Sequence, residues 1–431
     1  MSELPTGWIE APIGMVCEVV GGSTPRTTVD DYWDGDIPWL TPDDLSRDRS
    51  QYVAAGRRCL TKTGYSSCST QLIPAGSVLY TSRAPIGYVA IAKQAVCTNQ
   101  GFKSFVPPPG LSSRYLYWYL QWATPMIRNL GSGTTFAEIS GKVAKTIPLR
   151  LPPTAEQERI VVAIEEQVSR LDTAEQLLGR VRRRSAQMRA AVLAQAVEAD
   201  WPVKPLGELL VSVRNGIFVS RPAPGPPGVP ILRISAVRPL QLDLSDIRYA
   251  PISLSGADSY LLKGGDLLFT RYSGNPAYAG ACAVVPAHVT TVIHPDKLIR
   301  GVVDRSLVMP EFVAIAVNVG EGRRQIDERL KTTAGQVGIA GGQLKTVEIP
   351  IPPLKEQERV VAKVDHSLTI LDALATATDH SLFRSDHLRH SILERAFSGQ
   401  LVSQDPGDEP ASDLLARIAG EYTAQQRRKR A

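Results

Sequence analysis

Hydrogen-bond donors recur in short polar loops of this chain, where they could contact the edges of nucleic-acid bases. Base edges are read mainly by Arg, Lys, Asn and Gln side chains, and loops on a rigid scaffold usually present such side chains. The candidate base-reading residues are Thr24, Arg26, Ser82, Arg83, Arg214, Asn215, Arg221, Arg233, Arg271 and Tyr272. Any one of them is equally well explained as a solvated side chain or an internal ion pair, so the prediction concerns the set.

One short motif suggests a catalytic alternative, a DNA adenine methyltransferase. Residues Asn275 to Tyr278 read N-P-A-Y. This is close to the N-P-P-[YF] pattern, in which an amide holds the target amino group while an aromatic ring stacks on the flipped base. The second Pro is missing, and no Gly-rich turn suited to a nucleotide cofactor precedes the motif. A plain turn also accounts for Asn-Pro after Ser-Gly, so this function is the weaker alternative.

Other catalytic and metal-binding patterns are incomplete. The acidic turns at Asp43–Asp44 and at Asp296 have no well-spaced partner carboxylate and Lys of a nuclease, and Gly131–Thr135 (GSGTT) has no Lys of a phosphate-binding loop. The five cysteines are scattered without a C-x-x-C pair, which favours reduced thiols over a structural zinc site. The residues alone therefore offer no complete nuclease, ATPase or zinc-binding pattern.

Length and composition indicate a multidomain protein of ordinary globular character. A chain of 431 residues exceeds one typical core. No apolar stretch is long enough to span a membrane, and the first residues do not resemble a secretory signal, so we expect a cytoplasmic protein. The net charge of +5 and the pI near 8.9 are compatible with a polyanionic partner.

The chain repeats itself. LPPTAEQERIV at residues 151–161 returns as IPPLKEQERVV at 351–361. Trp8 with the P-[IL]-G that follows it returns at Trp201, and further matched phrases keep their order with an offset of about 189 to 200 residues. This pattern predicts a tandem duplication with differences in loop length.

Each half begins with a Gly- and Pro-rich part in which short apolar runs predict strands, at residues 77–81 and 88–92 and again at 266–270 and 281–285. One helix is expected in each part, at residues 113–130 and 310–330. We expect an α/β fold with this domain order: globular domain 1 (1–151), long helix 1 (152–199), globular domain 2 (200–351), long helix 2 (352–400), and a C-terminal tail with a short helix (401–431).

The second part of each half predicts a helix of about 45 residues, roughly 65 Å long. Thr154 and Gln157 have the spacing of a capping box. Apolar residues recur every three or four positions, as in a coiled coil: Val161, Ile164, Val168, Leu171, Met188 and Val192, repeated as Val361, Val364, Leu368, Leu371, Leu388 and Ile392. Such narrow stripes need a packing partner, so we expect the two helices to pair antiparallel and to separate two domains related by a pseudo-two-fold axis.

This pattern resembles the specificity subunit of type I restriction–modification systems. The two helix-opening phrases are its most specific part; the phrases at residues 79–92, 98–103 and 131–141 resemble those of the family's recognition domains, and residues 392–402 and 405–418 resemble its ending. The resemblance covers essentially the whole chain. The second half departs from it by lacking a phrase like TNQGFK (residues 98–103), so its DNA target need not be the same.

The resemblance implies a non-catalytic subunit that recognises a bipartite, asymmetric sequence in double-stranded DNA, one part per domain. It also implies two methylating subunits as partners, together with restriction subunits, and it places S-adenosylmethionine, ATP and Mg²⁺ on those partners. The polar helix starts are candidate docking residues: Glu156, Gln157, Arg159, Glu356, Gln357 and Arg359. A coiled-coil spacer protein that binds no DNA remains an alternative, and the salt dependence of DNA binding would discriminate it.

Overall fold

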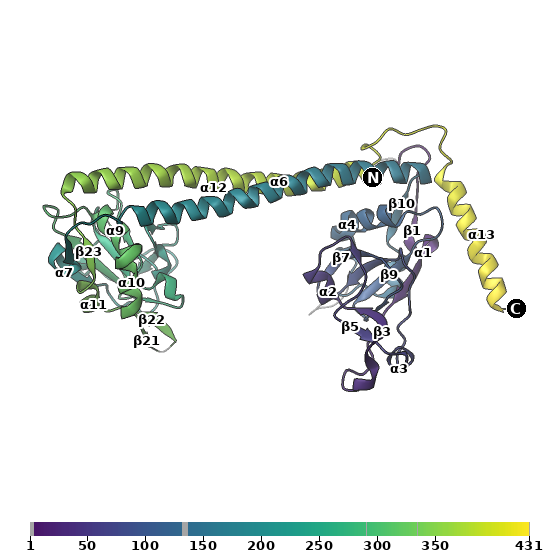
Figure 1. The fold of residues 1–431 in the computed structure, drawn as a ribbon, viewed down its shortest axis with the longest axis horizontal. Coiled ribbons are helices and arrows are strands. Elements are labelled where there is room, and N and C mark those ends of the chain that lie inside the picture. The colour runs from purple at the N-terminus through teal and green to yellow at the C-terminus, as the bar shows by residue number, and fades with distance from the viewer. Residues whose placement is uncertain (1–3, 132–136, 290, 334, 431) are drawn as a thin grey trace. The chain divides into compact units, whose positions relative to one another are not determined.

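The computed structural model describes residues 4–131, 137–289, 291–333 and 335–430 (Figure 1). It divides into two compact units, Met1–Leu178 with Ser381–Ala431 and Gly179–His380. Each unit therefore contains a globular part and a portion of both long helices. Residues 132–136 of the predicted phrase at 131–141 lie outside the described residues.

The first unit has a mixed α/β globular part. Its elements are β1 (Ile9–Pro12), α1 (Ile13–Val16), β2 (Glu18–Gly21), β3 (Trp33–Leu40), α2 (Pro42–Arg47), β4 (Tyr52–Val53), β5 (Arg58–Leu60), α3 (Lys62–Ser66), β6 (Val78–Ser82), β7 (Ile86–Ala92), β8 (Cys97–Thr98), β9 (Phe102–Val106), α4 (Ser113–Asn129), α5 (Gly141–Lys145) and β10 (Pro148–Leu151). The main sheet has the order β2-β9-β6-β7-β4, and two smaller sheets have the orders β5-β3-β8 and β1-β10.

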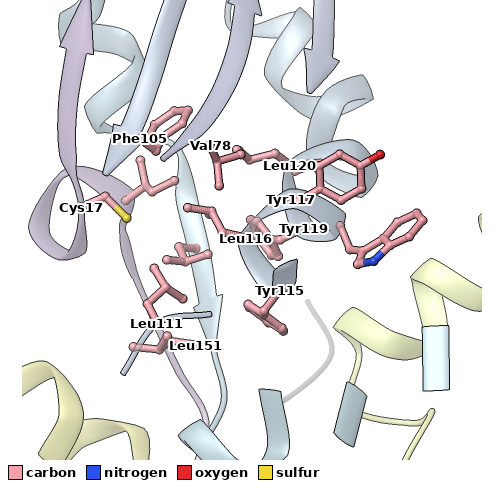
Figure 2. Close-up of a cluster of buried hydrophobic side chains, with 14 of the residues drawn as sticks. Cys17, Val78, Phe105, Leu111, Tyr115, Leu116, Tyr117, Tyr119, Leu120 and Leu151 are labelled. Carbon is pink, nitrogen blue, oxygen red and sulfur yellow. The ribbon is translucent and has the colours of Figure 1, made fainter. Parts of the chain in front are cut away.

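Strand alternation in β6 explains how this sheet is buried on both faces. Val78 and Tyr80 belong to the core that includes α4, whereas Leu79 belongs to a second cluster on the opposite face. Neighbouring strand residues point to opposite faces, so a fully apolar strand predicts burial on both sides. Figure 2 shows Val78 and Phe105 facing Leu116 and Leu120 of α4.

The second unit repeats this plan with different loops. Its elements are β11 (Val203–Pro205), α7 (Leu206–Leu209), β12 (Leu210–Asn215), β13 (Val229–Ile231), β14 (Val237–Arg238), β15 (Gln241–Leu242), β16 (Arg248–Ala250), α8 (Leu254–Ala257), β17 (Leu267–Thr270), β18 (Tyr272–Ser273), β19 (Cys282–Val284), β20 (Leu298–Val303), α9 (Pro310–Asn318), α10 (Gly320–Arg329), β21 (Lys331–Thr333), β22 (Gln336–Gly338), α11 (Gly341–Lys345) and β23 (Glu348–Pro350). Its sheet order β12-β20-β17-β19 matches β2-β9-β6-β7, and β11-β23 matches β1-β10.

The strands predicted at residues 77–81, 88–92, 266–270 and 281–285 are confirmed as β6, β7, β17 and β19. The prediction of a single helix at 310–330 is wrong, because the helix is interrupted between α9 and α10. Gly320 has a φ of +55°, and a Cβ at Gly322 would lie 2.2 Å from the carbonyl oxygen of Ala316. Two glycines thus allow a sharp turn that other residues would not.

Both long helices are present, as α6 (Thr154–Gln195) and α12 (Leu354–Phe397). The predicted capping box at Thr154 is wrong. The hydroxyl of Thr154 donates to the carbonyl of Gly110, and the side-chain amide of Gln157 donates to the carbonyls of Gly110 and Pro152. Both side chains therefore fasten the helix to the globular part instead of closing on its own first turn.

Within the first unit, α6 and α12 run antiparallel. Glu175 accepts a hydrogen bond from Ser385 (2.6 Å), and Asp172 pairs with Arg389 (2.6 Å). Lower residue numbers on α6 thus meet higher numbers on α12.

Within the second unit the same direction holds. Arg182 lies 3.8 Å from Asp379, and Arg189 pairs with Asp372 at 2.5 Å. Residues 189 and 372 stand 200 positions from residues 389 and 172 of the first unit, so the equivalent ion pair forms in both units with its partners exchanged between the helices.

The residues in this seam differ in part from those predicted, because Leu171, Val192 and Leu371 are confirmed and Met188 and Leu388 are not. Met188 and Leu388 are 49% and 48% exposed. Steps of four and three residues along α12 from Leu371 instead reach smaller or more polar residues, such as Ala375, Thr378 and Ser385. The half-buried or buried seam positions are Leu171, Glu175, Leu178, Ser185, Arg189 and Val192 on α6, and Leu371, Ala375, Thr378, Leu382, Ser385 and Arg389 on α12. Predicted positions near the helix starts, such as Val161 and Val361, instead join the globular cores.

The C-terminal segment also belongs to the first unit. It ends in α13 (Ala411–Arg430), whose residues Ala411, Leu414 and Ile418 are buried in the first unit's core. The backbone N–H of Ala411 donates to the carbonyl of Gly7 at 2.9 Å. The predicted tail helix is therefore part of a packed domain.

Candidate nucleic-acid interface

In the first unit, the loop after β2 is pressed against the end of β8. A Cβ on Gly22 would lie 2.1 Å from the carbonyl oxygen of Asn99, so only glycine fits there. The backbone N–H of Ser23 donates to the carbonyl of Thr98 at 3.0 Å. Thr24 then donates its hydroxyl to the side-chain oxygen of Gln100 at 2.5 Å. This bond holds the exposed Gln100 amide with its NH₂ group unused by Thr24.

Two buried indoles fix the rest of this loop. Trp39 donates to the carbonyl of Ser23 (3.1 Å) and Trp33 to that of Arg26 (3.4 Å). These two bonds fix the backbone of the loop, while the side chain of Arg26 is exposed. An exposed Arg on a firmly held loop is suited to contacting an anionic or base-edge acceptor.

The two residues predicted at the end of β6, Ser82 and Arg83, lie in different environments. Arg83 is half-exposed and lies 3.7 Å from Glu138, and both can still reach solvent. The prediction that Ser82 reads a base is wrong, because its side chain is fully buried and donates to the carbonyl of Gly101 at 3.1 Å. Lys103 reaches the Ser82 hydroxyl at 3.4 Å, and burial lowers the pKa of its ammonium despite the nearby Glu138. Ser82 therefore supports the loop from inside and cannot touch a ligand.

The second unit builds the equivalent loop with other side chains. Gly216 lies against the carbonyls of His294 and Pro295, as Gly22 does against Thr98 and Asn99. The backbone N–H of Ile217 donates to the carbonyl of His294 at 3.0 Å. The register places Phe218 where the first unit has Thr24, and Asp296 where it has Gln100. Phe218 is 74% exposed, which is unusual for a large apolar side chain.

A groove of about 460 Å³ runs beside Phe218. Arg233, Arg248 and Lys297 contribute its basic side chains. Asp246 pairs with Arg233 (2.6 Å) and Arg248 (3.3 Å) and so orients both guanidinium groups. An exposed aromatic ring beside basic groups is the composition of surfaces that stack bases and contact phosphates.

The other predicted residues of this unit are less closely grouped. Arg271 donates to the carbonyl of Asp296 at 3.3 Å, and its guanidinium lies 4.9 Å from the ring of Tyr272. Arg214 donates to the carbonyl of Ser259 and stacks over Tyr260, outside the groove lining. Asn215 and Arg221 are exposed.

Sequence reasoning missed Gln100, Phe218, Lys297 and Arg248. A signal for the first existed, because Gln100 lies in the phrase TNQGFK that was already singled out. Phe218 was hidden because apolar residues are usually taken as core. Only the pairing of Ile217 with His294 shows that it occupies the place of Thr24.

The prediction that Gln157 and Gln357 are docking residues is wrong, because both side chains are buried. Gln157 accepts from the backbone N–H of Ser112 (2.9 Å), and Gln357 accepts from that of Met309 (2.8 Å). Gln357 also donates to the carbonyls of Leu307 and Pro352, matching the bonds of Gln157 to Gly110 and Pro152. Neither side chain is accessible to solvent, so the repeated Gln is a structural link between each helix and its globular part.

Glu156 is likewise buried, and Trp8 donates its indole N–H to this carboxylate at 3.0 Å. Burial raises the pKa of Glu156, while the Trp8 bond opposes the rise. Its repeat counterpart differs, because Glu356 is partly exposed and pairs with Arg359 at 3.1 Å in the same helix. Arg159 instead pairs with Asp408 of the C-terminal segment at 2.5 Å.

The methyltransferase motif forms a turn. Asn275 accepts a hydrogen bond from the backbone N–H of Ala277 at 3.1 Å and starts a short 3₁₀ turn at Pro276–Tyr278. The amide oxygen is thereby used locally, as in an Asx turn. Across the described ranges, no group of three or more His, Cys, Asp or Glu side chains could hold a metal ion, and none of the helices described is long and apolar enough to cross a membrane.

Comparison with known proteins identifies the family. Residues 5–181 match the family model of the type I restriction modification DNA specificity domain. The chain is 27% identical to the EcoKI specificity subunit of Escherichia coli K12, over 98% of this chain and 97% of that protein. The chain is thus similar to specificity subunits of type I restriction–modification systems over nearly its whole length, and residues 5–181 match their DNA specificity domain. It is therefore related to the recognition component of such systems and not to a catalytic one.

Other relatives agree with this assignment. The MjaIX specificity subunit of Methanocaldococcus jannaschii is 40% identical, over 38% of each chain. The HsdS subunit from Thermoanaerobacter tengcongensis has a similar fold, with a TM-score of 0.57 at 18% identity, covering 93% of this chain and 98% of that one. A chain from a structure of an assembled type I system has a TM-score of 0.73, also at 18% identity, covering 93% and 100%.

Proposed function

We propose that this specificity subunit reads a bipartite, asymmetric sequence in double-stranded DNA, one part with each globular domain. One observation carries the proposal. Both units present the same loop against the same strand end, but with Thr24 and Gln100 in one and Phe218 and Asp296 in the other. Equivalent placement indicates equivalent use, and different side chains favour different bases.

Each half of the DNA sequence would thus be read by its own chemistry. In the first unit, Arg26, Arg83 and the Gln100 amide can donate to base or phosphate acceptors. In the second, Phe218 offers an apolar ring for a thymine methyl group or an unstacked base, with Arg233 and Arg271 nearby. We retain Thr24 as the residue that orients Gln100, and Tyr272, Arg214, Asn215 and Arg221 as contacts at the edge of this surface.

We further propose that the two halves arose by duplication and that α6 and α12 form a coiled-coil spacer. The matched sheet orders, the repeated Gln bonds and the exchanged ion pairs, Arg189–Asp372 and Arg389–Asp172, support this proposal. In a two-fold pair of equivalent helices, each contact must occur twice with its partners exchanged.

The proposed complex includes two methylating subunits and restriction subunits, which would bind S-adenosylmethionine, ATP and Mg²⁺. A function on cellular DNA would place it in the cytoplasm. The solved chain from the study of type I complex assembly has a fold similar to that of this chain, and this similarity of fold supports a role in assembly. Among the predicted docking residues, Arg159, Glu356 and Arg359 keep accessible side chains, and the buried Glu156, Gln157 and Gln357 no longer qualify.

The proposal is tested by sequencing methylated sites in cells that carry this chain with its methylating partner. We expect one two-part sequence with a constant gap, and exchange of one globular part for that of a relative should change one part only. A continuous or single-part site would contradict the proposal. Absence of salt-sensitive DNA binding would favour the DNA-independent spacer, because a protein that contacts phosphates releases counterions and loses affinity as salt rises.

A further inference from the structure

A groove of about 290 Å³ lies beside the start of α12 in the second unit. Trp201, Val360 and Val364 line its apolar part, and Arg359 and Lys363 contribute positive charge. Trp201 and Val360 are only half-buried there. Apolar side chains beside exposed cations suit a ligand that is apolar at one end and acidic at the other.

The first unit shows what covers this position when it is filled. The repeat equates Trp8 with Trp201 and Ile160 with Val360, and both Trp8 and Ile160 are buried. Leu401 and Val402, which follow α12 in the chain, pack against the same core. Asp405 and Pro406 of the same segment line one cavity with Trp8, so this segment lies beside the equivalent position in the first unit.

The same segment neutralises the arginine at the helix start. Arg159 pairs with Asp408, and its side chain is 36% exposed, whereas that of Arg359 is 79% exposed. Arg359 contacts Glu356 in its own helix. Leu401 and Val402 thus pack against the core of the first unit, while Asp408 contacts the arginine at its helix start.

No such covering segment follows α6 in the second unit. α6 ends at Gln195 and β11 begins at Val203, whereas α12 ends at Phe397 and α13 begins at Ala411. The longer connection carries Leu401, Val402 and Asp408, and the shorter one goes directly to the next strand. The second unit thus lacks its own cover for an equivalent surface.

We propose that the Trp201–Arg359 groove docks a segment of the methylating subunit that carries adjacent aliphatic residues followed by an acidic turn. The inference rests on the proposed function, because it takes that subunit as the partner. It also distinguishes the two helix starts. Arg159 is already paired with the chain's own C-terminal segment, so Arg359 is the arginine that receives a partner.

The groove's chemistry is tested with a fluorescent peptide of residues 398–412 added to the full chain. Its own copy of this segment already covers the first unit, so saturable binding reports on the second. We expect Arg359→Glu and Lys363→Glu each to weaken binding by about 10-fold or more. Arg384→Glu, an equal charge change at an exposed position of α12 outside the groove, should leave binding unchanged. Absence of saturable binding, or equal binding by all variants, would overturn the proposal.

The partner is tested by native mass spectrometry of the chain with its methylating subunit. We expect two copies per wild-type or Arg384→Glu chain and one copy per Arg359→Glu chain, with unchanged thermal unfolding confirming that the variant folds. Two copies on Arg359→Glu would refute the assigned partner. Dimers of the chain alone that disappear in Arg359→Glu but persist in Arg384→Glu would refute it in favour of a second copy. A wild-type complex of normal stoichiometry without sequence-specific DNA binding would instead sink the proposed function.

Discussion

At the residue scale, Gln100 is the side chain best placed to choose a base. The hydroxyl of Thr24 donates to the side-chain oxygen of Gln100, which leaves the NH₂ group of Gln100 to donate to an acceptor in a DNA groove. We expect Gln100→Ala to weaken binding to the cognate site by about 1–3 kcal/mol, through one half-sequence only. The measurement is DNA binding by the assembled complex against sites altered in either half.

Gln94→Ala is the matched control, because Gln94 is also exposed in the first unit but bonds to the carbonyl of Ala54. It should leave binding unchanged. Equal weakening on every DNA sequence by Gln100→Ala would show that Gln100 contacts the backbone and not a base.

Arg83 makes a second test in the same unit, because its ion pair with Glu138 leaves the guanidinium partly exposed. Arg83→Ala should also affect only the half-sequence read by the first unit, by about 1–3 kcal/mol if the contact to a base is bidentate. A uniform loss on all sequences, with a shallower salt dependence, would instead make Arg83 a phosphate contact.

His294 makes the second unit sensitive to acid. Its Nδ1 lies 3.0 Å from the carbonyl of Tyr260, and burial lowers its pKa from 6.5 to about 4 despite that bond. Between those values the unfolded chain binds more protons than the folded one, so the stability present above pH 6.5 is lost as the pH falls towards 4. The loss should approach about 3 kcal/mol. Hydrogen exchange in Leu298–Val303 across this range measures it.

His288→Gln is the comparison for this prediction, because His288 is exposed in the same unit. It should keep the acid dependence, whereas His294→Gln should flatten it. An unchanged slope in His294→Gln would assign the acid sensitivity to another group.

At the element scale, the buried Gln at each helix start joins the long helix to the globular part. Gln157→Leu keeps the approximate size but leaves the backbone N–H of Ser112 and two carbonyls without their bonds. We expect a loss of about 3 kcal/mol in the first unit. Faster hydrogen exchange in the first turns of α4 and α6 should report it, while the second unit is unchanged.

Gln176→Leu, at an exposed position of α6, is the control and should cost little. Gln357→Leu should reproduce the effect in the second unit. If neither buried substitution altered exchange, the repeated Gln would have to be kept for another reason.

The sequence predicted most of these elements and fewer of their contacts. Runs such as residues 77–81 contain enough apolar residues to define strands, and the repeated helix phrases define α6 and α12. The seam was partly misplaced because Met188 and Leu388 are apolar, while the half-buried and buried positions include Ser185 and Ser385, whose polar side chains are typical of a surface. The buried role of Gln157 was also missed, because a hydrogen bond to Ser112, 45 residues away, leaves no local signal.

At the scale of the whole molecule, the length of the helix pair should set the gap between the two half-sequences. One added heptad keeps the seam in register and lengthens the pair by about 10.5 Å, roughly three base pairs of B-DNA. Glu175 faces Ser385 and Arg182 faces Asp379, so insertions that face each other belong at the Arg182–Asp379 pair.

The test variant carries one heptad after Arg182 and another before Asp379. We expect methylation maps to show the same half-sequences with a gap longer by about three base pairs. A heptad in only one helix should instead destabilise the pair, because seven residues lose their partners. An unchanged gap in the double variant would mean that the helices connect the domains without measuring distance.

The Gln bonds at the helix starts have a consequence for exchange of the globular parts. The side chains of Gln157 and Gln357 hydrogen-bond to backbone groups of the globular parts, at Gly110 and Ser112 in one case and Leu307 and Met309 in the other. These bonds do not depend on which side chains stand at those positions, although Trp8 adds a side-chain bond to Glu156 in the first unit. We expect exchange of a globular part at the Pro-Pro boundaries to keep the Gln bonds wherever the new backbone follows the same path.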